Sequence, residues 1–151
     1  SHVEKRGFFH FSATFLPEYA MPDQIDPASP ALPFQARVAP WVTACFGEQL
    51  ANDPAERNHR FLEESLELAQ ACGATAAEAH HIVDYVFGRD TGDKAQEIGG
   101  VMVTLAALCQ AQGLDMHQAG ERELELIWEK IAAIRAKRAG KPSFTAADPL
   151  S

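Results

Sequence analysis

The sequence has little that would suit a membrane or a nucleic acid. No apolar run approaches the ~18 residues that a membrane-crossing helix needs, and no charged start is followed by an apolar signal core. Basic residues are few, because 13 Lys and Arg stand against 21 Asp and Glu and give a formal net charge of -8. Such an acidic chain disfavours nonspecific binding to a phosphate backbone, although a nucleotide that carries Mg²⁺ remains compatible with it. We therefore expect a cytoplasmic protein that binds neither membranes nor nucleic acids.

Cysteine is also scarce, and no stretch of any length alternates apolar and polar residues as a β-strand does. The three thiols, Cys45, Cys72 and Cys109, lie far apart in apolar helical surroundings, which favours buried free cysteines over a disulfide or a redox pair. At 151 residues and 46% hydrophobic content, the chain suits one domain with a modest core. These absences leave all-α as the expected class.

Proline and phenylalanine separate the start of the chain from the rest. Residues 1–33 hold five of the nine prolines and four of the nine phenylalanines. Prolines at this density deny a helix its backbone donors, so we expect an extended N-terminal arm, with Ser1 and His2 typical of a tag remnant. Residues 34–139 should form the helical domain, and residues 140–151 a loose C-terminal tail.

Start and stop signals divide the helical domain into four or five helices. Asp53 before Pro54 suits an N-cap, and Gly73 ends the helix that they begin. Thr75, followed three residues later by Glu78, predicts a capping box. The helix expected over 93–112 contains the run VMVTLAALC, which is apolar on all sides, so it should be the central and most enclosed helix. The expected architecture is a four- to five-helix bundle.

Three glutamates stand close together in the helix that follows Asp53. Glu63, Glu64 and Glu67 are three and four residues apart, so their side chains reach one patch of surface. Glu64 has Phe61 and Leu68 as helical neighbours, which places the acids at the edge of the apolar stripe. Like charges held there repel one another, and a cation relieves the repulsion. A hard divalent metal is the natural cation for oxygen ligands.

A second pair of acids lies at the start of the next long helix. Asp93 and Glu97 are four residues apart and share a face, just before the apolar run. A favourable charge at a helix N-terminus would also explain Glu97. Two acidic helices packed side by side would, however, supply the oxygens that hold one or two Mg²⁺ ions and leave room for substrate phosphates.

The motifs EESLE at residues 63–67 and EIGG at residues 97–100 resemble the EExxE and ExxD motifs of the MazG-like, all-α nucleoside triphosphate pyrophosphohydrolases. The resemblance covers residues 58–138, including GLDMHQAG and the basic IWEKIAAIRAKR. Within that family the chain is most similar to the phage-type branch, whose MazZ-like members hydrolyse dGTP and dATP. Gly100 stands where the family has its final aspartate, and Asp93 or Asp84 are the candidates to replace that carboxylate.

This resemblance implies hydrolysis of a nucleoside triphosphate, by attack of water on the α-phosphorus, to a monophosphate and pyrophosphate. Glu64, Glu67 and Glu97, with Asp93, would hold Mg²⁺ or Mn²⁺. Glu63 and Glu64 would be the catalytic pair, with Glu63 either a further ligand or the base that orients the water. The family also implies a homodimer or homotetramer. If the chain is phage-encoded, its location would be the host cytoplasm.

Cations must meet the phosphate oxygens that the metal does not reach. Solvated surface charge is the simpler explanation for each lysine, and a core position is the simpler one for the tryptophan. The candidates for phosphate contact are Lys94, Lys130 and Arg135, with Arg57 and Arg60 behind them, and Trp41 could stack on the base. No motif reads purine against pyrimidine or deoxyribose against ribose.

Two other functions fit parts of the pattern. Glu56 with His59 and Glu78 with His81 each form ExxH, the spacing of di-iron carboxylate bundles, although both glutamates also suit helix capping. A non-catalytic oligomerisation or interaction module would carry its acids as solvated helix faces. Metal dependence separates the three, because the pyrophosphohydrolase gains stability from Mg²⁺ or Mn²⁺, the interaction module is indifferent, and the di-iron protein co-purifies with iron.

Overall fold

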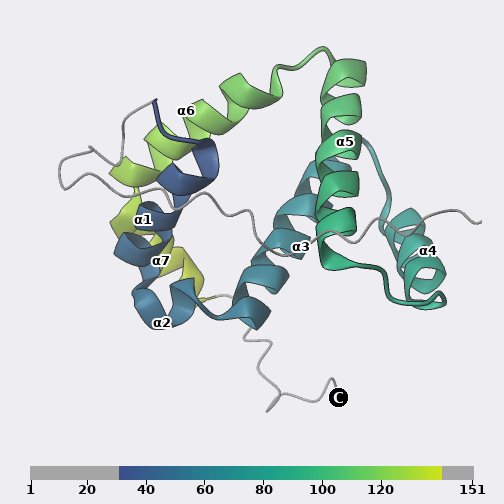
Figure 1. Cartoon of the computed structure of the whole chain (residues 1–151), viewed down its shortest axis with the longest axis horizontal. Helices are drawn as coiled ribbons and strands as arrows, with labels where there is room; N and C mark the ends of the chain where they lie inside the picture. The colour runs from purple at the N-terminus through teal and green to yellow at the C-terminus, as the bar shows by residue number, and fades with distance from the viewer. Residues whose placement is uncertain (1–30, 141–151) are drawn as a thin grey trace, which may run out of the picture.

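The computed structural model describes residues 31–140, and the rest of the expected arm and tail lies outside the described residues. All regular structure in this part of the chain is helical, which confirms the all-α class. Seven helices follow one another along the chain (Figure 1): α1 (Phe34–Phe46), α2 (Glu48–Ala51), α3 (Pro54–Ala71), α4 (Ala76–Phe87), α5 (Lys94–Gln112), α6 (Met116–Glu129) and α7 (Ile131–Ala139).

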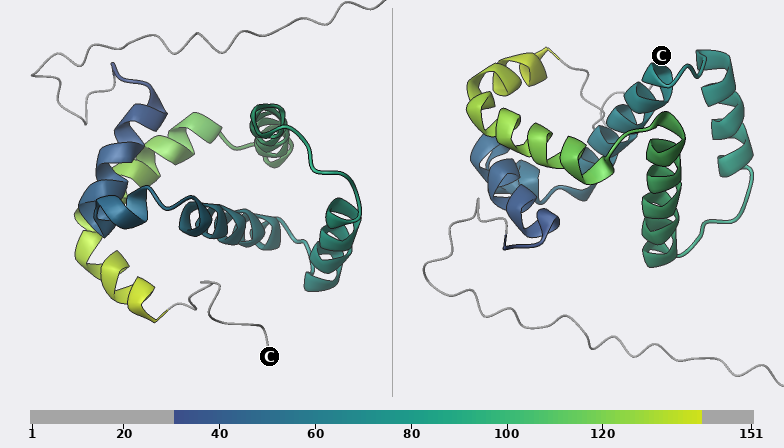
Figure 2. Two further views of the ribbon diagram at one scale, coloured as in Figure 1. Left: turned by 60° about the horizontal axis from the view of Figure 1, so that its bottom comes forward. Right: turned by 90° about the horizontal axis from the view of Figure 1, so that it is seen from above.

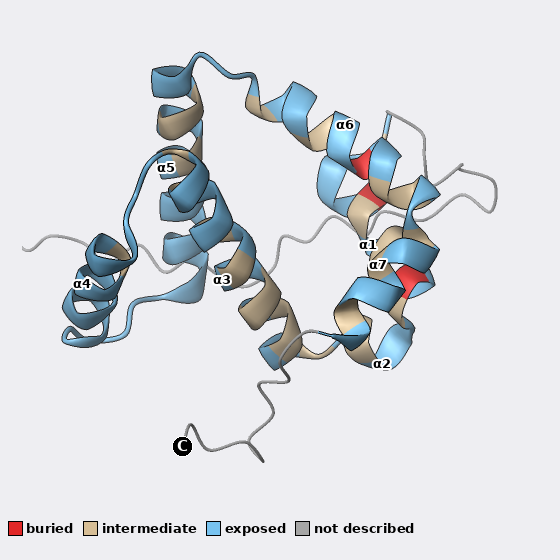
Figure 3. Cartoon of the chain, turned by 180° about the vertical axis from the view of Figure 1, so that it is seen from behind, coloured by how far each residue is buried: buried red, intermediate tan, exposed pale blue. Residues whose placement is uncertain are grey.

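One part of the molecule, here called the packed region, consists of α1, α2, α6 and α7. Helix α1 contacts α2, α6 and α7, so that the two ends of the helical domain lie together (Figure 1). The residues classed as buried in the described chain are all here: Cys45 at 1% exposure, Leu124 at 5% and Arg37 at 7% (Figure 3). Arg37 compensates its burial by a two-pronged ion pair with Glu121 of α6, in which one nitrogen donates at 2.8 Å.

Side-chain caps begin the long helices where the sequence predicts them. The Asp53 carboxylate accepts hydrogen bonds from the backbone N–H groups of Ala55 and Glu56, with Pro54 at the first helical position. Thr75 and Glu78 form the predicted capping box. These caps satisfy backbone donors that the first turn leaves free, so the start of each helix is determined locally.

The final helix is broken where the sequence suggests one continuous helix. Helix α6 ends at Glu129, and α7 begins at Ile131 after a non-helical Lys130. The break allows α7 to lie against α1, where Arg135 donates hydrogen bonds to the carbonyl oxygens of Cys45 at 2.7 Å and Ala44 at 2.6 Å. Arg135 therefore satisfies free carbonyls at the C-terminal end of α1.

The second part, here called the open region, consists of α3, α4 and α5. It is one continuous segment that leaves the packed region through α2 and returns through α6 (Figure 2). None of its residues is buried. The expectation that α5 is the most enclosed helix is therefore wrong for the single chain, because α5 contacts α6 at one end and has no extensive contact with α3 or α4 along its length.

Among the described residues no single helix is long and apolar enough to cross a membrane. Helices α5 and α6, bent by 100° at the break between them, satisfy the length and composition requirements only when they are taken together.

Candidate functional site

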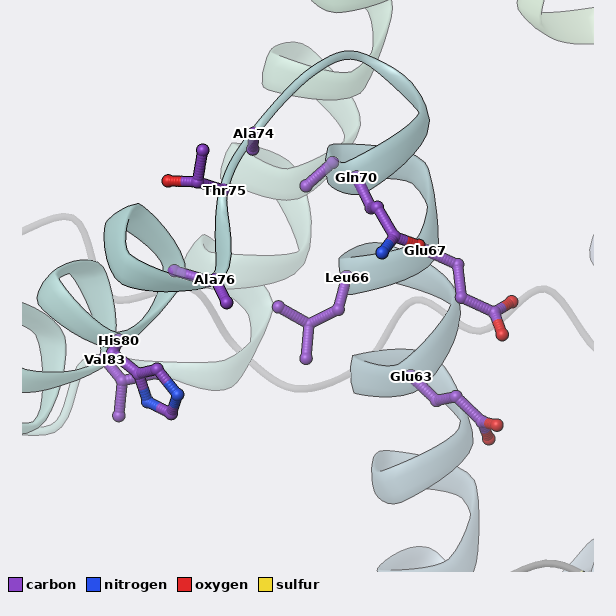
Figure 4. A pocket seen from close by; sticks show the side chains of 11 residues that line it. Glu63, Leu66, Glu67, Gln70, Ala74, Thr75, Ala76, His80 and Val83 are labelled. Atoms are coloured by element: carbon purple, nitrogen blue, oxygen red, sulfur yellow. The ribbon is translucent and has the colours of Figure 1, made fainter.

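The acidic residues of α3 lie beside its apolar side, as the helical spacing predicts. Helices α3 and α4 border an open groove of about 390 Å³, into which Leu66 points from α3, toward Val83 and His80 of α4 (Figure 4). The carboxylates of Glu63 and Glu67 point away from α4 (Figure 4). Glu63 and Glu67 nevertheless contribute to the lining of this groove, at its α3 border.

A second cleft lies where α3 meets the packed region, and it gathers charges that the sequence leaves scattered. Its volume is about 570 Å³, within the range of small-molecule sites. One carboxylate of the acidic motif, Glu64, is at its wall. Four cations, a second carboxylate and several apolar side chains complete the lining: Arg57, Arg60, Lys137, Arg138, Glu123, Trp41, Phe46, Phe61, Ile127 and Ile134.

The cations in this cleft are arranged around the ring of Phe46. The Arg57 guanidinium carbon lies 5.3 Å from the ring centroid, and that of Arg138 lies 5.8 Å from it. Trp41 meets the same ring edge-on at 5.7 Å. Attraction between a guanidinium and an aromatic face holds the charges in place without neutralising them. The cleft therefore keeps two oriented cations beside two aromatic rings.

Burial is the main cause of a lowered pKa for the Arg57 guanidinium. The charge of Glu56 opposes this shift, and the neighbouring charges of Arg138 and Arg60 add to it. A cation crowded by other cations in a partly dry site is stabilised when an anion arrives. The electrostatics of the cleft therefore favour an anionic ligand.

Glu56 is the carboxylate that holds the arginines together. Its Oε1 lies 3.2 Å from Arg138, 3.4 Å from Arg60 and 3.6 Å from Arg57. Arg60 also donates a hydrogen bond of 2.5 Å to Glu63. The three guanidiniums share the Glu56 carboxylate, and Arg60 also pairs with Glu63, so the acidic motif is fixed to the same cluster.

Several buried donors in the cleft have no hydrogen-bond acceptor among the described residues. They are Nε1 of Trp41, Nε and one terminal nitrogen of Arg57, and Nε of Arg60. Leaving a buried donor without an acceptor costs about 1–3 kcal/mol. A ligand with oxygen acceptors would satisfy them.

The expected metal ligands are not brought together in the single chain. Within residues 31–140, no three acidic, histidine or cysteine side chains gather closely enough to hold a metal ion. The side chain of Glu97 folds back over Gly92, since a Cβ there would lie 2.1 Å from its Oε1. Asp93 is the N-cap of α5 and accepts hydrogen bonds of 3.1 Å from two backbone N–H groups. Helix α5 does not pack along α3, so Glu97 and Asp93 remain apart from Glu64 and Glu67, and the ligand set stays a prediction.

The structure separates the predicted phosphate contacts into two groups. Arg57, Arg60 and Trp41 meet in the cleft. Lys94 begins α5 and Lys130 lies at the break between α6 and α7, both exposed and outside the cleft lining. Arg135 has a different role in the structure. Its guanidinium donates hydrogen bonds to backbone carbonyl oxygens at the end of α1.

The glutamates of both ExxH pairs are used elsewhere. Glu56 is surrounded by the three arginines, and Glu78 belongs to the capping box of α4. These partners account for both residues without iron, and the di-iron alternative stays a prediction.

Some cleft residues are not predictable from motif spacing. From the sequence, Arg138 and Lys137 are interpreted as charges that complement the negative end of a helix dipole, and Phe46 is interpreted as a core residue. The sequence does contain one signal, the concentration of cations in IWEKIAAIRAKR, but only the packing of α7 on α1 shows which of them reach α3.

With this geometry in hand, comparison of the chain with protein-family models, with curated proteins and with solved structures gave no match.

Proposed function

We propose that this protein hydrolyses nucleoside triphosphates to the monophosphate and pyrophosphate with Mg²⁺ or Mn²⁺, in the manner of the MazG-like pyrophosphohydrolases that its motifs resemble. The observation that carries the proposal is the cleft beside α3. There Glu64 of the EESLE motif lines the same cleft as Arg57, Arg60 and Arg138, together with the rings of Trp41 and Phe46. Its preferred substrates are proposed to be purine deoxynucleotides such as dGTP and dATP, drawn from a cytoplasmic pool.

The chemistry of the cleft lining corresponds to the parts of a nucleotide. Guanidinium groups bind phosphate oxygens with charge-assisted hydrogen bonds, and Arg57 and Arg60 carry nitrogens that lie near Glu56 but make no hydrogen bond among the described residues. Aromatic rings offer a stacking surface for a base, and the indole N–H of Trp41 offers a donor. A triphosphate whose charge is partly neutralised by these cations would bring its phosphate chain toward Glu64.

A divalent metal would be held first by the carboxylates of α3. Glu64 and Glu67 supply oxygen donors of the type that Mg²⁺ and Mn²⁺ prefer, and Mg²⁺ usually completes its shell with water and substrate phosphates. Glu97 of α5 is the proposed further ligand. When bound, such an ion activates a water and neutralises the charge of the leaving pyrophosphate. Asp93 has a capping role that explains it without a metal.

The side chains of this chain then have distinct tasks. Arg57 and Arg138 bind and orient the phosphates, and Trp41 with Phe46 excludes water from one side of the cleft. Glu63 is held by the 2.5 Å hydrogen bond from Arg60, which fixes its carboxylate in one orientation. Glu63 itself lies outside the cleft lining and is tied to it through Arg60, and this fixed carboxylate is the proposed base that accepts a proton from the attacking water.

The test is pyrophosphate release from the eight common NTPs and dNTPs with Mg²⁺ or Mn²⁺, with wild type compared with Glu64→Gln. The matched control is Glu129→Gln, which removes a charge from α6 outside the cleft. We expect EDTA to abolish release, and Glu64→Gln to lower kcat/KM by about 100-fold or more, because a metal ligand acts in the transition state. Glu129→Gln should retain full activity. Folded wild type that releases no pyrophosphate from any nucleotide with either metal would overturn the proposal.

A non-catalytic interaction module is the second candidate, and the exposed apolar faces of the open region favour it. Helices α3, α4 and α5 present apolar side chains suited to binding another protein. This candidate predicts no change in melting temperature when Mg²⁺ or Mn²⁺ is added, whereas an enzyme that binds the ion in its folded state gains stability by mass action.

A further inference from the structure

The groove between α3 and α4 has a mostly apolar lining and is open to solvent. Its volume is about 390 Å³, and Leu66 of α3 points across it toward Val83 of α4 (Figure 4). Leu66 and Val83 are each 44% exposed, and neither helix has a buried residue. Contiguous apolar surface that a folded chain leaves exposed in a groove marks a binding site for apolar side chains. The groove is therefore suited to an apolar segment from outside residues 31–140.

The residues that line this groove carry negative formal charge and no positive one. All of them lie within residues 61–88, which include five Asp and Glu but no Lys or Arg. Glu67, in the lining, makes no ion pair with any described residue. The cleft beside α1 differs, because four cations line it. The groove therefore favours a segment that is both apolar and positively charged, and the cleft does not.

One segment of the chain outside the described residues has this composition. Residues 5–15, KRGFFHFSATF, hold one lysine, one arginine and four phenylalanines, and no acid. Residues 141–151, at the other end of the chain, hold one lysine, one aspartate and a single phenylalanine. A phenylalanine that becomes buried removes roughly 150–250 Å² from water, so four of them provide most of the apolar area that a groove of this kind can cover. Residues 5–15 thus match the groove in polarity and in charge.

The length of chain between this segment and the helical domain is sufficient for the two to meet. The fifteen residues from 16 to 30 span up to about 50 Å when extended. Helix α2 joins the end of α1 to the start of α3, and α1 and α3 have 13 and 18 residues, which correspond to about 20 and 27 Å. The connecting residues are therefore longer than the two helices laid end to end, and residues 5–15 can reach the groove of their own chain.

We propose that residues 5–15 bind in the groove between α3 and α4 of their own chain, with the phenylalanines against the apolar lining and with Lys5 and Arg6 at the acidic border near Glu67. Burial of the aromatic rings supplies the affinity, and the charges select this groove over the arginine-lined cleft. Attachment to the same chain raises the local concentration of the segment, so that a modest affinity is enough to fill the groove. This interaction lies outside the cleft and goes beyond the proposed hydrolysis.

The first experiment places the photoreactive amino acid p-benzoylphenylalanine at Phe9 of the full chain. The protein is irradiated, and the cross-linked peptides are identified by mass spectrometry. We expect most cross-links to the helical domain to fall on residues 63–83 of the same chain. Isotope-labelled and unlabelled chains are mixed before irradiation, so that a link between two copies is recognised by its mixed label.

Two pairs of variants test the apolar and the charged part of the contact. Leu66→Glu places a charge in the apolar lining and should lower the yield of these cross-links by about fivefold or more. Its matched control is Leu126→Glu on α6, at 42% exposure against 44% for Leu66, which should leave the yield unchanged. Lys5→Glu with Arg6→Glu should lower the yield by about threefold or more, whereas Lys5→Arg with Arg6→Lys keeps both charges and should keep the yield. The variants at Lys5 and Arg6 lie outside residues 31–140, so they keep the test valid if Leu66→Glu does not fold.

Three results would overturn the proposal. Cross-links that concentrate on α1, α6 or α7 would place the segment elsewhere, and cross-links spread evenly over the chain would show that it has no fixed site. Links that join two copies would make the occupant the segment of a second chain. None of these measurements uses a nucleotide or a metal, so their outcome is independent of the proposed activity.

Discussion

The packed and open regions of this helical domain differ in how far they bury their side chains. In the packed region, α1 collects a small core around Cys45 and Leu124 and compensates the one buried charge, Arg37, with Glu121. In the open region every helix begins with a side-chain cap, which α1, α2 and α7 of the packed region lack, yet no residue of the open region is buried. The difference teaches that caps and propensity can define a helix locally, whereas enclosure needs neighbouring helices.

The comparison is tested most strongly by mixing two inactive variants. If the proposed function holds and the carboxylates of α3 and α5 meet across two copies, Glu67→Gln and Glu97→Gln are each inactive alone. Unfolding and refolding them together should restore about a quarter of wild-type pyrophosphate release, because half of the dimers are mixed and each mixed dimer has one intact site of two.

The control for this mixture is Glu67→Gln refolded with itself, which should stay inactive. Active wild type without recovery in the mixture would place both carboxylates of a site in one chain. Inactive wild type would instead refute the proposed function.

A truncation in the packed core should have the next largest effect. Leu124→Ala removes a side chain that is 5% exposed, and we expect it to lower the free energy of unfolding by about 2–4 kcal/mol because a cavity remains. Leu126→Ala on the same helix should cost less than about 1 kcal/mol. Urea unfolding followed by circular dichroism measures both, and equal losses would show that the packed region has no distinct core.

Asp93 allows the cap and the metal role to be separated within the open region. Asparagine caps a helix as well as aspartate does, so Asp93→Asn should preserve stability, whereas Asp93→Ala should cost about 1 kcal/mol. Because the carboxylate is occupied by two backbone N–H groups, we also expect Asp93→Asn to keep its pyrophosphate release. A large loss of activity with intact stability would make Asp93 the replacement for the aspartate that the family has at the position of Gly100.

The smallest effect concerns the ion pair that joins α1 to α6. The hydrogen bond from Arg37 holds the pKa of the Glu121 carboxyl below its ordinary value of 4.5. A lowered pKa in the folded state contributes stability above the unfolded pKa, and this contribution is lost as the pH falls through the folded value. The melting temperature of wild type should therefore fall more steeply than that of Glu121→Gln between about pH 5 and pH 3. Parallel curves would show that the pair adds nothing to the packed region.

The local features of the fold were predictable from the sequence, and the long-range ones were not. Asp53, Thr75 and Glu78 act within three residues of their own positions, so their spacing is sufficient to predict the caps. The break at Lys130 accompanies the contact of α7 with α1, and no residue near Lys130 in the sequence predicts it. The apolar run of α5 predicts a helix and predicts its enclosure, and only the helix is confirmed, because no residue of α5 is buried.

The residues of the candidate site also separate into those that local spacing predicts and those that only long-range packing brings together. The acidic patch of α3 follows from helical spacing, and Arg57, Arg60 and Trp41 were selected for their chemistry and are found in one cleft. The sequence does not predict Arg138, which lies on α7 far from α3 along the chain, or Phe46, whose apolar ring suits a core position. Arg135 was chosen for its charge, which says nothing about the carbonyl oxygens at the end of α1 that it binds.

The three free thiols are divided between the two regions, and we expect them to react with an alkylating reagent at different rates. Cys45 is 1% exposed in the packed region, and burial raises the pKa of its thiol, which lowers the fraction of reactive thiolate. Cys72 and Cys109, in the turn after α3 and on α5, are only half-buried. An alkylating reagent should therefore modify Cys72 and Cys109 before Cys45, and labelling of Cys45 would report how often the packed region opens.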